Sequence, residues 1–130
     1  MKRKKVLVTG DRQGYSLDKI TEVLKQLWED GYRILSHGGA RGVDFQAGAV
    51  AHSIGYEIRV YKAEWGKYGK AAGPHRNKHM LVMEMPDLVV GFHALLSESR
   101  GTADCLRQAR KMHINSVLYG KDEDVDTWKF

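Results

Sequence analysis

Hydrophobic residues along this chain alternate between short continuous runs and stripes at helical spacing. Five apolar runs predict buried strands over residues 4–9, 32–36, 57–61, 87–91 and 116–119. After the first run, apolar side chains recur at i, i+3, i+4, i+7 and i+8, namely at Ile20, Val23, Leu24, Leu27 and Trp28. This stripe predicts an amphipathic helix that Ser16 caps and that runs to about Asp30.

The same criteria predict three more helices. One spans 43–54 and ends at Gly55, and another spans Pro74–Met85 with proline in its first turn. The apolar face of the last helix is carried by Thr102, Cys105, Leu106, Ala109 and Met112. The tail over 120–130 is acidic and then aromatic, and we assign it no element.

Strands that alternate with helices predict an α/β fold with a parallel sheet and right-handed crossovers. We expect a single domain over 1–130, built as a Rossmann-like three-layer sandwich, with a basic tail over 1–4. The favoured topology is a five-stranded parallel sheet in the order 3-2-1-4-5. Ligands of such sheets bind beyond the carboxyl ends of the strands, at the switch point, which here lies between the first and fourth strands.

Composition narrows the class of protein. With 42% hydrophobic and 28% charged residues, the 130-residue chain resembles an ordinary soluble globule, and it has no apolar run long enough for a membrane span. Cys105 is the single cysteine and lies on an apolar helix face, so we expect a buried thiol and a cytoplasmic setting. The net charge is +5, but residues 2–5 supply four of these charges. The rest is nearly balanced, which disfavours nucleic acid as the partner.

Polar, glycine-rich segments follow each of the first four strands. They are Gly10-Asp11-Arg12, then His37 to Asp44, then Gly73 to Asn77, and Arg100-Gly101-Thr102. The carboxyl ends of parallel strands share one edge, so these segments predict a pocket there. We expect four arginines to converge on it, namely Arg12, Arg41, Arg76 and Arg100.

The second segment reads Ser-His-Gly-Gly-Ala-Arg-Gly-Val-Asp over 36–44, between a strand and a helix. A glycine-rich turn, a helix N-terminus and an arginine suit the phosphate of a nucleotide-like molecule. A tight turn whose glycines serve packing alone is the alternative. Asp44 either complements the helix dipole and holds Arg41 or contacts a sugar hydroxyl. Thr102 is expected to cap its helix, and Asn77 to cap a loop.

Phosphate contacts alone fall short of micromolar affinity, so the ligand also needs a wall for a flat group. Trp65 and Tyr68 lie in the loop Lys62–Ala71, which is either a lid or a surface loop. His75 and His79 have the i, i+4 spacing of metal ligands, but no third ligand is evident. We therefore expect no metal and no cofactor besides a nucleotide-derived ligand.

Four motifs in their order and spacing resemble the YspA-like branch of the SLOG superfamily, from residue 5 to about 119. They are Val-Thr-Gly-Asp-Arg, His-Gly-Gly-Ala-Arg-Gly-Val-Asp, Ala-Gly-Pro-His-Arg-Asn-Lys-His-Met and Ser-Arg-Gly-Thr-Ala-Asp. The superfamily also includes LOG-type phosphoribohydrolases and the Smf/DprA domain. The resemblance implies a Rossmann-like fold, nucleotide-derived ligands and a role in phage–host conflict or nucleotide signalling. The matching positions are Gly10, Arg12, His37, Gly38, Gly39, Arg41, Gly42, Asp44, Gly73, Pro74, Arg76, Asn77, Gly101 and Thr102.

The chain departs from the family pattern at two places. Asp11 stands where the branch more often has serine. The corresponding motif of the LOG-type enzymes is Pro-Gly-Gly-x-Gly-Thr-x-x-Glu. In this chain, Glu98 and Ser99 stand in place of its first two glycines, and Cys105 stands in place of its glutamate. Asp104, one residue earlier, points about 100° away on a helix. The carboxylate expected to assist glycosidic cleavage is thus missing from its place.

These observations favour a sensor or binding module that holds a nucleotide-like ligand without consuming it. The alternative is an N-glycosidic-bond hydrolase that uses Asp11, Asp44 or Asp104, although no acid–base pair is evident by type and spacing. A second alternative is nucleic-acid binding, as Smf/DprA kinship suggests. Met80, Leu81, Met83 and Met85 exceed what one helix face needs, so a homodimer contact is expected there.

Overall fold

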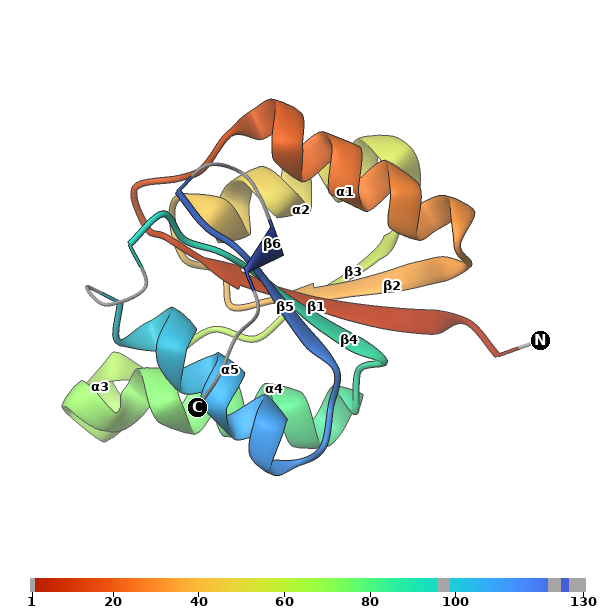
Figure 1. The fold of residues 1–130 in the computed structure, drawn as a ribbon. Coiled ribbons are helices and arrows are strands. Elements are labelled where there is room, and N and C mark those ends of the chain that lie inside the picture. Colours follow the sequence, from red (N-terminus) through yellow and green to blue (C-terminus); the bar gives the residue numbers. More distant parts are fainter. Residues whose placement is uncertain (1, 96–98, 122–124, 127–130) are drawn as a thin grey trace.

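Six strands form one sheet in the order β3-β2-β1-β4-β5-β6 (Figure 1). The computed structural model describes residues 2–95, 99–121 and 125–126, so Glu98 and the acidic stretch 122–124 lie outside the described residues. The strands are β1 (Lys4–Gly10), β2 (Tyr32–His37), β3 (Glu57–Val60), β4 (Leu88–Phe92), β5 (Ser116–Tyr119) and β6 (Val125–Asp126). The first five pair in parallel, which confirms the predicted order. The antiparallel strand β6, within the tail that was given no element, is an addition.

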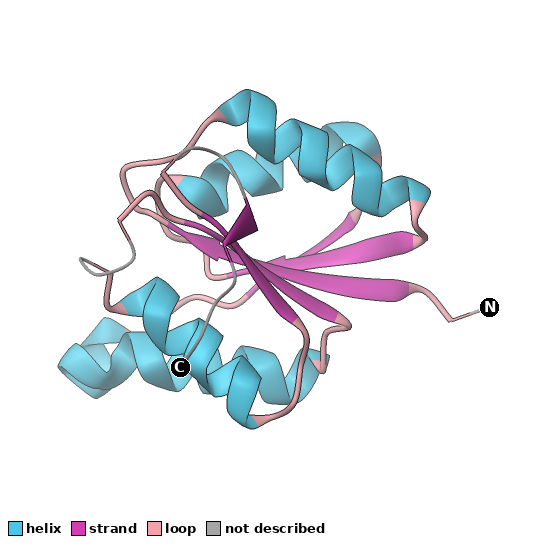
Figure 2. Cartoon of the chain, in the orientation of Figure 1, coloured by secondary structure: helices cyan, strands magenta, loops and turns pink. Residues whose placement is uncertain are grey.

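Helices cover both faces of the sheet, so the fold is the predicted Rossmann-like three-layer sandwich (Figures 1 and 2). Helices α1 (Leu17–Glu29) and α2 (Val43–Ile54) lie on one face. Helices α4 (Ala72–Glu84) and α5 (Gly101–Lys111) lie on the other. The segment that the sequence left as a loop contains a short helix α3 (Trp65–Tyr68) and a 3₁₀ turn η1 (Gly69–Ala71).

Local chemistry explains where the helices begin. The hydroxyl of Ser16 accepts a hydrogen bond from the amide of Lys19 at 3.1 Å, as expected of an N-cap. Helix α4 begins at Ala72, slightly earlier than predicted, and keeps Pro74 in its first turn, where its missing N–H costs little. The expected cap of α5 is wrong. The hydroxyl of Ser99 accepts from the amides of Thr102 and Ala103, at 3.0 and 3.3 Å, so Thr102 does not cap the helix.

The core forms on both faces of the sheet from the predicted stripes. Ile20, Leu24 and Val43 are fully buried between the sheet and the helices α1 and α2. On the other face Cys105 is fully buried, as expected, and burial raises the pKa of its thiol to about 12. At neutral pH it is therefore an inert thiol rather than a nucleophile.

Two expectations for the surface of the fold can be compared with the structure. Met80 and Leu81 are buried in the core, whereas Met83 and Met85 are exposed, so only part of the expected dimer surface is available. The basic segment at the start of the chain continues into the sheet, because Lys4 is already the first residue of β1. None of the described helices is long and apolar enough to cross a membrane.

Candidate functional site

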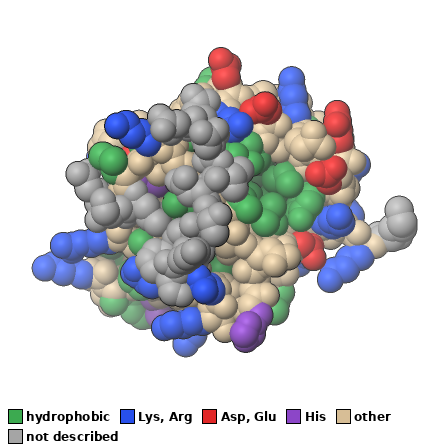
Figure 3. Space-filling view, viewed as in Figure 1, with side chains coloured by type: hydrophobic (Ala, Val, Ile, Leu, Met, Phe, Trp, Pro, Cys, Tyr) green, Lys and Arg blue, Asp and Glu red, His purple; other side chains and the backbone are tan. Residues whose placement is uncertain are grey.

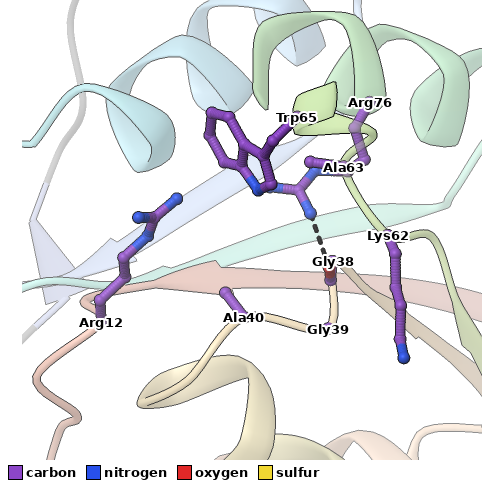
Figure 4. A pocket seen from close by; sticks show the side chains of 8 residues that line it. All are labelled: Arg12, Gly38, Gly39, Ala40, Lys62, Ala63, Trp65 and Arg76. Atoms are coloured by element: carbon purple, nitrogen blue, oxygen red, sulfur yellow. Dashed lines mark hydrogen bonds between the residues drawn. The ribbon is translucent and has the colours of Figure 1, made fainter. Parts of the chain in front are cut away.

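A cavity of about 270 Å³, here called the first cavity, opens beyond the carboxyl ends of β2 and β3. It is lined by Arg12, Gly38, Gly39, Ala40, Lys62, Ala63, Trp65 and Arg76 (Figure 4). The loops after β1, β2 and β3 and the helix α4 therefore meet at one place. Within the described part of the chain, this lining has three cationic side chains and no acidic one.

Arg76 connects the first cavity to the backbone of the sheet. From α4, its Nη1 donates hydrogen bonds to the carbonyl of Gly38 at 2.6 Å and to that of Tyr61 at 3.2 Å. Its Nε donates to Oδ1 of Asn77 at 2.9 Å. No hydrogen bond between described residues uses Nη2, so both of its N–H groups can serve a ligand. Burial lowers the pKa of Arg76, and Arg12 adds to this effect while Asp44 opposes it. A bound anion would therefore favour the charged guanidinium.

Arg12 and Trp65 form the outer wall of the first cavity. The guanidinium of Arg12 lies 5.5 Å from the centre of the Trp65 ring, and Figure 4 shows Arg12 pointing from its loop toward the indole. Trp65 is 50% exposed, which leaves ring surface for a flat group to stack on. The stem of Lys62 packs on Gly39, and its ammonium points away from Trp65 (Figure 4). Arg12 and Arg76 are thus the two cations that face the space below the indole.

The backbone amides of the glycine-rich turn after β2 donate hydrogen bonds to the side chains of the residues that flank it. Oδ2 of Asp44 accepts the amides of Gly38 and Ala40, both at 3.1 Å, and Nδ1 of His37 accepts the amide of Gly39 at 2.9 Å. These three N–H groups of the glycine-rich turn are thus already bonded within the protein. Asp44 lies in the first turn of α2, where its charge complements the helix dipole as expected, but it accepts turn amides, and no ion pair with Arg41 is found between described residues. Its contact with a sugar hydroxyl stays a prediction.

The glycines at this edge allow close packing between loops. Gly42 has φ +76°, and a Cβ there would lie 2.3 Å from the carbonyl oxygen of Asp11. A Cβ on Gly10 would lie 2.6 Å from the carbonyl oxygen of Phe92, and one on Gly38 would lie 2.0 Å from Nη1 of Arg76. The packing interpretation is therefore confirmed for these three glycines, and the ligand interpretation stays a prediction.

The pKa values of two neighbouring buried side chains, His37 and Asp44, differ from their ordinary values. Burial is the largest cause for both groups, and it raises the pKa of Asp44 and lowers the pKa of His37. For Asp44 the hydrogen bonds from the turn amides, the charge of Arg76 and, when it is protonated, the charge of His37 act in the opposite direction. A neutral His37 is also required by geometry, since its Nδ1 is a hydrogen-bond acceptor.

We expect His37 to make the fold sensitive to acid. Because its pKa in the folded chain lies below 6.5, the unfolded chain takes up the proton first, and the free energy of unfolding falls as the pH drops below about 6.5. Urea unfolding between about pH 7.5 and 5.5 should show a steeper loss of stability for the natural chain than for His37→Gln, which keeps an acceptor but does not titrate. Identical pH dependence of the two proteins would contradict this.

Two of the four expected arginines do not contribute to the lining of the cavity. Arg41 and Arg100 are exposed and do not line it. Of the fourth motif, Gly101 lies in open space and Thr102 is buried, with its methyl group close to Gly91. The first cavity therefore lies on the β2–β3 side of the expected switch point between β1 and β4.

The remaining predicted residues contribute to packing. Gly73 is buried at the start of α4, where a Cβ would lie 3.6 Å from the Trp65 ring. Asn77 is also buried and does not cap a loop. Its Nδ2 donates to the carbonyl of Gly101 at 3.2 Å and to Asp104 at 3.0 Å, and so it joins α4 to α5.

None of the three candidate catalytic carboxylates lines the first cavity. Asp44 holds the turn, and Asp104 accepts from Asn77 and, at 2.8 Å, from Gln108. Oδ1 of Asp11 accepts the amide of Gln13 at 2.8 Å. These hydrogen bonds give each carboxylate a structural partner.

Three residues near the site were not predicted individually: Lys62 and Ala63, which belong to the predicted loop Lys62–Ala71, line the first cavity, and His93 lies beside Asp11. Lys62 and Ala63 follow β3, and their position at the carboxyl edge was the signal that could have revealed them. His93 follows β4 and is buried, with Nε2 3.8 Å from Oδ2 of Asp11, and no motif indicated it. On the face seen in Figure 3, the acidic side chains lie toward the top and the right, where they are mixed with Lys and Arg, and Lys and Arg also lie on the left, where the strands end.

Comparison with known proteins places the chain in a family. No model of a known protein family matches it. The Gene 61 protein of Mycobacterium phage D29 is 32% identical to it over 124 residues, and the alignment covers 90% of this chain and 97% of the phage protein. At this identity and coverage, the chain belongs to the same family as the Gene 61 protein of Mycobacterium phage D29.

Proposed function

We propose that this protein is a binding or sensing module for a phosphorylated, nucleotide-like ligand, which occupies the first cavity. The observation that carries this proposal is the pairing of Arg12 and Arg76 with a half-exposed indole, in a described lining without carboxylates. The guanidinium groups suit a phosphate, and Trp65 suits a flat ring.

The magnitudes agree with a small ligand of this kind. Each charge-assisted hydrogen bond contributes about 1.5–3 kcal/mol, and a base stacked on an aromatic ring contributes about 1–3 kcal/mol. Two arginines and one indole can therefore approach the about 8 kcal/mol of micromolar binding. Backbone amides of the turn add little, because those of Gly38, Gly39 and Ala40 are already bonded.

The geometry favours binding over N-glycosidic hydrolysis, because Asp11, Asp44 and Asp104 do not line the first cavity and each accepts a hydrogen bond from within the protein. Nucleic-acid binding through the basic segment receives less support. The guanidinium of Arg3 pairs with Glu57 at 3.1 Å, and the amide of Lys5 donates to Asp87 at 2.8 Å, at the opposite edge of the sheet. Kinship with the SLOG superfamily is part of the proposal, and the phage relative agrees with the phage-related role that it implies.

Replacing Arg12 with alanine tests the proposal, since Arg12 is exposed and its loss leaves the core intact. We expect adenosine monophosphate to raise the melting temperature of the natural chain and to bind Arg12→Ala about tenfold more weakly. Arg41→Ala is the matched control, because it removes the same charge outside the cavity and should change affinity by less than about twofold.

Equal loss in both variants would indicate a general effect of charge and contradict a site at Arg12. Chromatography of the incubated nucleotide distinguishes the alternatives. Unchanged nucleotide supports a sensor, and release of free base or ribose phosphate supports the hydrolase.

A further inference from the structure

A second cavity, of about 350 Å³, adjoins the first at the carboxyl edge. Lys62 and Arg76 line both cavities, so the two spaces meet at these side chains. The short helix α3 borders both, because Trp65 at its start lines the first cavity and Tyr68 at its end lines the second. A ligand anchored at Arg76 can therefore extend to either side of this residue.

Aromatic rings dominate the second cavity. Tyr68 and His75 are stacked with ring centres 4.0 Å apart and planes at 21°, and Tyr61 meets His79 edge-on at 5.6 Å. All four residues line the cavity. A stacked pair already in place offers a further planar ring a preformed surface, which limits the conformational entropy lost on binding.

Glu64 gives the second cavity a carboxylate acceptor, which the described lining of the first cavity lacks. It is an acidic residue in the lining, and its carboxylate can accept from ribose hydroxyls or from the amino group of a base. The same carboxylate would repel a phosphate placed beside it. The phosphate is therefore best held in the first cavity and at Arg76, and an uncharged nucleoside suits the second.

We propose that the ligand carries two ring systems joined through phosphate, one against Trp65 in the first cavity and one against Tyr68 and His75 in the second. This inference rests on the proposed function, and it narrows the ligand from a mononucleotide to a dinucleotide-like molecule. Arg76, shared by both cavities, contacts the phosphate bridge between the rings.

Calorimetric titration of the full chain with diadenosine diphosphate and with adenosine monophosphate tests the inference. The second ring adds a stacking contact, so we expect the dinucleotide to bind about tenfold or more tightly than the mononucleotide. Tyr68→Ala should remove most of this advantage while leaving the affinity for the mononucleotide within about twofold. Phe45→Ala is the matched control, because Phe45 is a 73% exposed aromatic residue that lines neither cavity.

The outcomes separate this inference from the function on which it rests. Equal affinities for the two probes, or an advantage that Tyr68→Ala preserves, would overturn the two-ring ligand and leave nucleotide binding standing. Binding of neither probe would overturn both proposals. Circular dichroism of Tyr68→Ala checks folding, and His75→Ala on the adjacent helix α4 provides a second variant of the same stacked pair.

Discussion

Replacement of Arg76 with alanine is expected to abolish nucleotide-induced stabilisation and also to lower the free energy of unfolding by about 3–5 kcal/mol. Both effects have one origin. The guanidinium joins the carbonyl groups of Gly38 and Tyr61 at 2.6 and 3.2 Å, and its loss leaves these acceptors without their donor at the ends of β2 and β3. Urea unfolding measures the lower free energy of unfolding, and thermal shift with adenosine monophosphate measures the loss of nucleotide-induced stabilisation.

Arg76→Lys separates charge from geometry. Lysine keeps the positive charge but lacks the planar fork that bonds two carbonyls while leaving Nη2 for a ligand. We therefore expect Arg76→Lys to recover part of the binding and little of the stability. Full recovery of both would show that a charge at this position is sufficient, contrary to the role assigned to the fork.

Gly42→Ala is expected to destabilise the fold by more than about 3 kcal/mol. The residue has φ +76°, which disfavours any side chain, and its new methyl group would lie 2.3 Å from the carbonyl oxygen of Asp11. The methyl group is fixed directly to the Cα atom and the carbonyl belongs to the backbone, so neither can rotate away. Separation of the loops after β1 and β2 would also displace Arg12, and so affinity should fall together with stability.

Gly101→Ala is the matched control for this loss. Gly101 belongs to the predicted ligand set, but its Cβ would meet no atom within 4 Å and the residue begins α5. The free energy of unfolding should therefore stay unchanged or rise by up to about 1 kcal/mol. Chemical denaturation of both variants provides the comparison, and equal destabilisation would refute the steric argument.

The architecture could be predicted well because the spacing of apolar residues along the sequence indicates which side chains of each helix or strand are buried. Val43 and Leu24 fall on stripes that had to face a sheet, and the alternation of strands and helices left few topologies. It also located the carboxyl edge, where Arg12, Gly38, Gly39 and Arg76 now line the first cavity. The two-residue strand β6 has too few residues for a periodic signal.

The direction in which side chains point within turns could not be predicted from the sequence. Arg41 lies between Gly39 and Gly42, whose φ values of +72° and +76° are backbone states that no residue pattern specifies in advance. The chain reverses there, and Arg41 ends exposed. The hydrogen bonds that Asp44 accepts from the turn amides depend on the tertiary structure and could not be predicted either. In the sequence, a carboxylate at a helix start has the same pattern whether it interacts with the helix dipole, a ligand or the preceding loop.

The hydrogen bonds within the turn over Gly38–Ala40 bear on which residues could change ligand selectivity in this protein family. Because the turn amides are bonded within the protein, selectivity for the proposed ligand would depend on exposed side chains such as Arg12 and Trp65. Substitutions at these two positions should therefore change which ligand is recognised while leaving the fold beneath them intact.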